Sequence, residues 1–131
     1  LVGRGTLALA TCCLLATTAA GLVAYRAYRV TTAALWAGAD TLTAAGVPPR
    51  DIYAGFEYLG THGVLAERAQ AMQPGESWND VVMRIDSPYV VLIEPAQPVR
   101  PWPEGYRRME AWNVDLLPGV RRTIVVGRAD P

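Results

Sequence analysis

The feature that most constrains this chain is an uncharged run from Thr6 to Tyr25, with Arg4 before it and Arg26 and Arg29 after it. At about 1.5 Å of rise per helical residue the run reaches about 30 Å, which matches the hydrocarbon core of a bilayer. The run therefore predicts a membrane span. We expect residues 1–30 to form this transmembrane helix with its flanks, and residues 31–131 to form one small soluble domain.

The residues that flank the run fit the polar boundary of a membrane. Tyrosine rings and long cationic side chains are satisfied at the headgroup level, where an apolar body and a polar tip both find partners. The predicted membrane-interface anchors are Arg4, Tyr25, Arg26, Tyr28 and Arg29.

The composition of the run favours a helix that packs among other membrane helices. Alanine, threonine and glycine make it only moderately apolar, and Ala16, Ala20 and Ala24 recur at a spacing that lets helix backbones approach closely. Because the chain begins at Leu1 and not at methionine, we expect the run to be the last span of a longer protein. A cleaved signal peptide is the main alternative, but its apolar region should be about 7–15 residues long.

The charges after the run exclude one class of partner. All 12 basic residues of the chain are arginines, which indicates a GC-rich, bacterial genome, and the acidic residues all follow the run. Residues 31–131 carry a small net negative charge and no basic stripe, so nucleic-acid binding has no electrostatic footprint. One arginine before the run and two directly after it favour a cytoplasmic domain only weakly. The two cysteines, Cys12 and Cys13, lie inside the run, so we expect no disulfide framework.

The pattern after the run predicts an α+β fold: the transmembrane helix is followed by a small α/β sandwich of about four mostly antiparallel strands, with helices on one face. Thr31 and Thr32 can cap a helix that stops at Gly46. Met109 and Trp112 are expected to face inward, and Pro118-Gly119 is expected to form a turn. The predicted strands are 52–58, 89–94, 106–116 and 123–128, and a short helix is expected over 64–72.

No motif of catalytic or metal-binding chemistry is present, so we predict no catalytic residue, metal site or cofactor in this chain. Asp51, Glu57 and His62, the one histidine, cluster near the first strand. They could form an acid-base group, but a turn residue, a solvent-facing residue and a loop residue are the simpler interpretation.

The aromatic residues separate into a core set and an exposed candidate. Trp36 and Trp112 are expected in the core, whereas Trp102 lies between two prolines and is expected to be exposed. Glu57, His62 and Trp102 are the candidate substrate-side surface.

Three segments carry a resemblance to a known family: ALWAGADTLTAAGVPPRDIYAGFEYLGTHG (34–63), SPYVVLIEP (87–95) and YRRMEAWNVDLLPGVRRTIVVGR (106–128). They resemble the C-terminal part of bacterial protein-mannosyltransferase-like and aminoarabinose-transferase-like membrane glycosyltransferases of the family 39 type. The resemblance implies a polytopic inner-membrane enzyme with a polyprenyl-phosphate-linked sugar donor. It also implies that the catalytic acid lies in an early loop upstream and that this tail is an extracytoplasmic accessory domain.

The implied partners are the lipid bilayer, the upstream membrane helices and the polyprenyl-phosphate sugar. Two other interpretations stay open. The chain could be a single-pass, membrane-anchored binding domain without enzymatic activity, or a small enzyme that uses Glu57 and His62.

Overall fold

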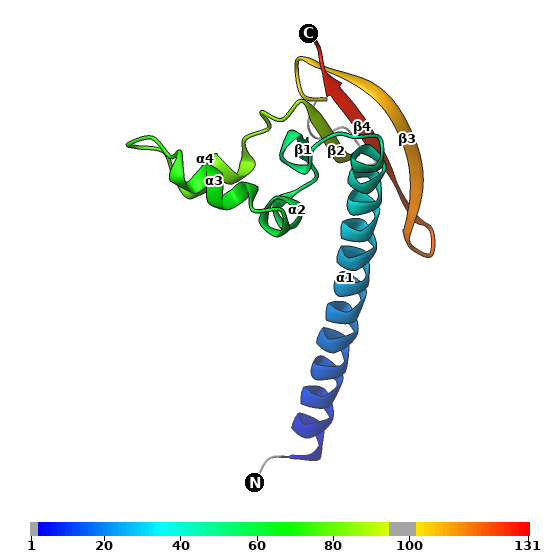
Figure 1. Ribbon diagram of the computed structural model, residues 1–131. Helices are drawn as coiled ribbons and strands as arrows, with labels where there is room; N and C mark the ends of the chain where they lie inside the picture. Colours follow the sequence, from blue (N-terminus) through cyan, green and yellow to red (C-terminus); the bar gives the residue numbers. More distant parts are fainter. Residues whose placement is uncertain (1–2, 95–101) are drawn as a thin grey trace.

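The computed structural model describes residues 3–94 and 102–131, which form one long helix followed by a small mixed sheet with short helices (Figure 1). The elements, in chain order, are α1 (Arg4–Ala44), a 3-10 turn (Pro49–Asp51), β1 (Ile52–Tyr53), α2 (Phe56–Thr61), α3 (Val64–Gln70), α4 (Trp78–Met83), β2 (Tyr89–Glu94), β3 (Tyr106–Leu117) and β4 (Val120–Ala129).

The sheet has four strands in the order β1-β2-β4-β3. β1 pairs with β2 in parallel, and the other two pairings are antiparallel. β2 lies between two neighbours, as its continuous apolar sequence predicts. β3 and β4 form a long hairpin that turns at Pro118-Gly119, as expected. The α+β class and the mostly antiparallel sheet are confirmed.

Helix α1 is continuous over 41 residues, or about 60 Å. The prediction that a second helix starts at a cap on Thr31 and Thr32 is wrong, because α1 continues through both threonines and no proline or glycine interrupts the sequence there. The predicted stop is confirmed: Gly46 has φ 92°, and its N–H donates to the carbonyl of Thr43 at 2.9 Å.

The C-terminal part of α1 lies across one face of the sheet and forms the core with it. Buried residues of α1, β1, α2, β2 and β4 meet there, and Trp36 and Trp112 pack around them, as expected. The helix approaches the sheet closely because Gly38 has no side chain: a Cβ there would lie 2.7 Å from Trp112 Cη2 and 2.8 Å from Val91 Cγ1.

The predicted strand over 52–58 is wrong beyond Tyr53. Gly55 has φ 88°, which breaks the extended backbone, and α2 begins at Phe56. The alternation that predicted a strand fails at Phe56, whose side chain is 53% exposed, while Tyr58 and the adjacent Leu59 are both buried. Consecutive buried residues fit one face of a short helix better than one face of a strand.

Two further differences have local causes. Met109 is exposed, not inward, because the pairing of β3 with β4 is irregular between Arg108 and Glu110 and a bulge of this kind re-aims the inserted side chain. Helix α4 was not expected, although its start carries a capping box: Ser77 accepts from the N–H of Asp80, and the Asp80 carboxylate accepts from the N–H of Ser77. The Ser77 hydroxyl also donates to the Asp80 carboxylate at 2.7 Å, and this hydrogen bond, together with the one from the Ser77 N–H, lowers the pKa of the Asp80 carboxyl.

Candidate membrane-interface site

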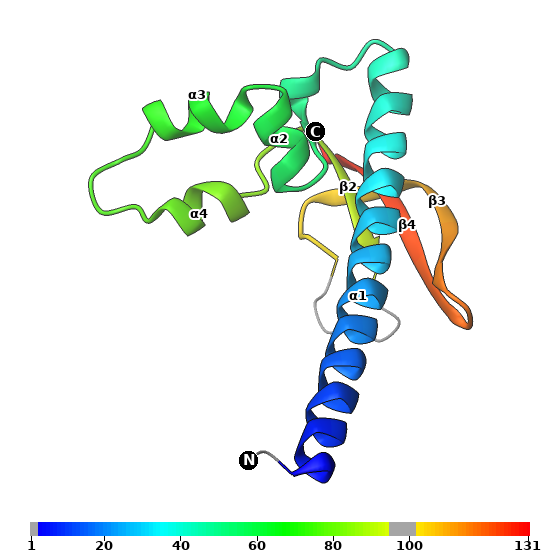
Figure 2. The ribbon, with the colours of Figure 1, turned by 90° about the horizontal axis from the view of Figure 1, so that it is seen from below.

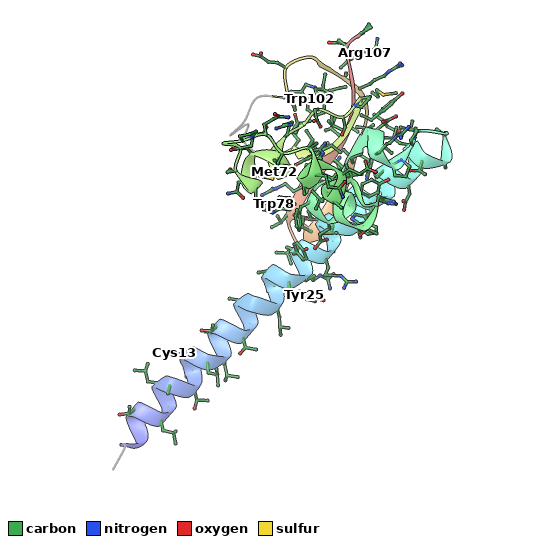
Figure 3. The ribbon with its side chains drawn as sticks, turned by 60° about the vertical axis from the view of Figure 1, so that its left-hand side comes forward. Cys13, Tyr25, Met72, Trp78, Trp102 and Arg107 are labelled. Carbon is green, nitrogen blue, oxygen red and sulfur yellow. The ribbon has the colours of Figure 1, made fainter. Side chains whose placement is uncertain are left out.

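The N-terminal part of α1 extends away from the sheet and its side chains are exposed (Figures 1 and 3). Leu14 is 67% exposed and Leu22 is 65% exposed. The helix is long and apolar enough to cross a membrane, and none of its most apolar window is buried against the rest of the structure. A soluble core helix is mostly buried, so this exposure distinguishes α1 from that class.

The predicted interface anchors lie where the helix meets the domain. Tyr25, Arg26, Tyr28 and Arg29 are all exposed, and Figure 3 shows Tyr25 just below the point at which the side chains of the domain begin. Arg29 Nη1 donates to Tyr25 Oη at 3.4 Å across one helical turn. Arg4 starts α1 at its other end. These tyrosines and arginines therefore lie at the boundary between the exposed part of α1 and the sheet domain.

A groove at this boundary, here called the junction groove, lies between α1 and α2. It has a volume of about 370 Å³ and is open to solvent; its lining residues are Tyr25, Tyr28, Arg29, Thr32, Ala33, Trp36 and Glu57. The indole ring of Trp36 packs edge-on against the ring of Tyr58, with 5.8 Å between the ring centroids. The buried Nε1 of Trp36 has no hydrogen-bond partner within the described residues. In the described part of the chain, this N–H is therefore a buried donor without an acceptor.

A second groove, here called the hairpin groove, lies between α1 and the turn of the β3–β4 hairpin. Its volume is about 460 Å³, and it is lined by Arg26, Asp115, Leu117, Pro118, Gly119 and Arg121. Arg121 Nε donates to Asp115 Oδ1 at 2.8 Å, and this hydrogen bond raises the pKa of the Arg121 guanidinium. None of the ion pairs in the described part of the chain includes Arg26.

The three residues of the predicted substrate-side surface do not form one site. Glu57 is exposed on α2 and lines the junction groove. His62 ends α2, and its ring centroid lies 4.4 Å from that of Tyr58. Trp102 packs over the β4 residue Gly127, on the face of the sheet opposite to α1. Within the described residues, no group of three histidine, cysteine or acidic side chains could hold a metal ion.

Trp102 is a packing residue and not the freely exposed aromatic that its sequence context predicts. A Cβ on Gly127 would lie 2.5 Å from Trp102 Cζ2, so the indole occupies the space that a side chain would fill. Its Nε1 donates to the carbonyl of Tyr106 at 2.6 Å, and the guanidinium carbon of Arg108 lies 5.0 Å from its ring. The rest of the proline-rich segment that precedes it lies outside the described residues.

A cluster of polar side chains, separate from both grooves, attaches the short helices to the sheet and has a structural role. Arg68 of α3 donates to the carbonyl of Arg84 at 2.8 Å and to the Asp86 carboxylate at 2.5 Å. Tyr106 of β3 donates its hydroxyl to the carbonyl of Ser87 at 2.7 Å. Burial of the Tyr106 ring, and then the nearby charge of Asp86, raise the pKa of its phenol.

Comparison with protein-family models, with characterised proteins and with solved structures finds no match. The resemblance to membrane glycosyltransferases therefore stays a prediction, and α1 and the two grooves are the features from which a function can be argued.

The sequence did not predict the hairpin groove. Its signal was present as LLPGVRR (116–122), an apolar turn followed directly by two arginines. That pattern was interpreted only as a turn between strands. What it could not reveal is that the turn lies beside Arg26, because the path of a hairpin relative to α1 is a tertiary property.

Proposed function

We propose that this chain is the last membrane helix and the surface domain of a polytopic bacterial inner-membrane protein. The observation that carries the proposal is the division of α1 into two parts. Its C-terminal part contributes Ala39 and Leu42 to the core, while the leucines of its apolar N-terminal part are exposed. A helix with this division anchors a folded domain directly at a membrane surface.

The exposed part of α1 is suited to contact with other helices. Ala16, Ala20 and Ala24 recur every fourth residue, and Gly21 has no atom within 4 Å of its hypothetical Cβ. Surfaces of small residues allow membrane helices to pack at short distances, where van der Waals contact replaces the missing hydrophobic driving force. We therefore assign this face to the neighbouring helices of the same membrane protein.

The protein class that we propose is a glycosyltransferase that uses a polyprenyl-phosphate-linked sugar. The support for this class is the resemblance of segments 34–63, 87–95 and 106–128, and the domain has an accessory role in it. The described residues bring together no acid-base pair: Glu57 lines the junction groove, while the His62 ring packs against Tyr58 at a tilt of 50°. The catalytic acid then belongs to another part of the protein, and the domain faces the extracytoplasmic side.

Two measurements test this proposal. The full-length protein, reconstituted in liposomes with a polyprenyl-phosphate-linked hexose, should transfer the labelled sugar to an acceptor, whereas a matched protein with the upstream loop acids replaced should not. A single cysteine at Gln73, an exposed residue between α3 and α4, should react with a membrane-impermeant maleimide in intact spheroplasts. Absence of transfer from several hexose donors overturns the class, and labelling only after lysis overturns the orientation.

A second candidate is a single-pass, membrane-anchored binding domain. The junction groove favours it, because the exposed carboxylate of Glu57 offers a hydrogen-bond acceptor beside an aromatic and apolar wall. The two candidates differ in assembly. A purified chain that is monomeric in mild detergent, with Ala20→Leu leaving its behaviour unchanged, supports the binding domain. Aggregation that other helices of the same protein relieve supports the polytopic protein.

A further inference from the structure

We propose that the turn of the β3–β4 hairpin is a second membrane contact, which inserts into the headgroup layer of an anionic bilayer beside α1. This inference rests on the proposed membrane span and goes beyond it, since a helix alone does not fix which part of the domain touches lipid. The partner is the bilayer surface, and the contact consists of an apolar turn with a group of arginines.

The path of the hairpin places its turn at the level where the span ends. Trp112 of β3 lies against Gly38 of α1. From Gly38 back to Arg26, α1 covers about 18 Å at about 1.5 Å per residue. From Trp112 to Leu117, β3 covers about 17 Å at about 3.3 Å per residue. The two elements therefore reach the same level, and Arg26 and Leu117 do line one groove.

Figure 1 shows the same arrangement, with the turn of the hairpin pointing toward the N-terminal end of α1 and the C-terminus at the opposite end of the sheet. Figure 2, viewed from below, shows the hairpin leaning away from the helix at its turn. Arg26 directly follows Tyr25, the last residue of the uncharged run. A bilayer that covers the run therefore also meets the turn.

The chemistry of the turn suits the interface between hydrocarbon and water. Leu117, Pro118, Gly119 and Val120 form an uncharged tip, and Pro118 and Gly119 are exposed. A solvent-exposed apolar tip at this level gains free energy by entering the headgroup region. The uncharged tip is therefore suited to enter the headgroup layer at the level where the span ends.

The charges around the tip select the kind of lipid. Arg26 and Arg121 line the hairpin groove, and Arg122 follows directly, whereas Asp115 is the one carboxylate in the lining. Asp115 already pairs with Arg121, so the group keeps an excess of positive charge toward its surroundings. Guanidinium groups bind phosphate oxygens in a bidentate manner, so lipid phosphates with a net negative headgroup fit this surface.

Site-directed spin labelling of the full chain in nanodiscs tests the contact. Cys12 and Cys13 are replaced by alanine, and single nitroxides are placed at Pro118, at Leu14 in the span and at Arg107. Arg107 is the matched control, because it is exposed at the other end of β3 and lies far from the span in Figure 3. In phosphatidylcholine with one quarter phosphatidylglycerol, the nitroxides at 118 and 14 should collide more with oxygen than with a water-soluble nickel chelate. The nitroxide at 107 should show the reverse.

The pattern of outcomes separates this inference from the membrane span on which it rests. Oxygen-dominated collisions at 14 together with nickel-dominated collisions at 118 overturn the hairpin contact and keep the span. Nickel-dominated collisions at 14 overturn both. A second label at Leu117 guards against a local effect of replacing Pro118, and agreement between the two positions is required.

The arginines are tested by lipid dependence. Removing phosphatidylglycerol should lower the membrane-inserted fraction of the label at 118, and Arg26→Gln or Arg121→Gln should each lower the insertion equilibrium about fivefold in the anionic nanodisc. Arg50 lies in the 3-10 turn that follows the C-terminal end of α1, so Arg50→Gln is the control and should leave the insertion equilibrium unchanged. An insertion equilibrium that is the same with and without anionic lipid overturns the role of the arginines.

Discussion

The close approach of α1 to the sheet at Gly38 makes a specific prediction. In Gly38→Ala the new Cβ would lie 2.7 Å from Trp112 Cη2 and 2.8 Å from Val91 Cγ1. Carbon atoms prefer separations of about 3.5–4.0 Å, so both contacts are repulsive. Val91 is fully buried on the central part of β2, and the Trp112 ring packs against the core, so neither can move away freely.

The magnitude follows from two opposing effects. Replacing glycine by alanine within a helix stabilises it by about 1 kcal/mol. Overpacking of a well-packed core costs about 1–3 kcal/mol. Because two separate contacts fall below van der Waals distance, we expect the overpacking effect to exceed the helix effect. After the helix effect is subtracted, Gly38→Ala should lower the free energy of unfolding of the domain by up to about 2 kcal/mol, and Gly38→Leu should separate α1 from the sheet.

The assay is urea unfolding in mild detergent micelles, followed by tryptophan fluorescence, because all 4 tryptophans follow the uncharged run. Gly21→Ala is the matched control, since a Cβ at Gly21 meets nothing within 4 Å and this residue lies outside the domain. It should not lower the unfolding midpoint, because it adds helix propensity without a steric contact. In the Trp112→Phe background the cost of Gly38→Ala should fall, because the nearest ring atoms are removed. A Gly38→Ala protein that is about 1 kcal/mol more stable than the wild type would refute the close approach.

Two further predictions use the same unfolding assay. Trp102→Ala should lower the free energy of unfolding by about 3 kcal/mol, because it uncovers Gly127 and removes the hydrogen bond to the carbonyl of Tyr106, and an unchanged midpoint would contradict this packing role. The raised pKa of Tyr106 means that the folded state holds the phenol proton more tightly than the unfolded state. The contribution of the protonated phenol to folding stability is therefore complete below about pH 10 and is lost as the pH rises through the folded-state pKa. Tyr106→Phe should therefore make the loss of stability at alkaline pH less steep. An equally steep loss in the variant would contradict this prediction.

The parts of the fold that sequence predicted well are those with one dominant local signal. The apolar run, the stop at Gly46 and the buried sequence of β2 each depend on residues within a single element. The errors occurred where a local pattern had two solutions. The alternation from Ile52 to Tyr58 predicts a strand, but the positive φ of Gly55 ends the extended backbone there. The alternation in β3 places Met109 inward, but the irregular pairing beside it turns its side chain outward.

The candidate site could also be predicted from the sequence only in part. The sequence alone predicts the group of interface anchors at the end of the run, because its members lie within one helical turn: Tyr25, Arg26, Tyr28 and Arg29. It does not predict the hairpin groove, because Arg26 and Arg121 are far apart along the chain and meet only after the hairpin has folded against α1. The position of Trp102 likewise depends on the space above Gly127.

The uninterrupted path of α1 also has a mechanical consequence. One helix of 41 residues contributes both the apolar segment and part of the core, with no hinge between them. Membrane helices tilt by about 20° on average, and the tilt changes with bilayer thickness. Without a joint, the sheet must turn through the same angle as the helix. On the side toward which α1 leans, this rotation moves the hairpin closer to the lipid, and on the other side it lifts it away. In the membrane arrangement that we propose, the domain therefore rotates together with the helix when a change in bilayer thickness alters the tilt.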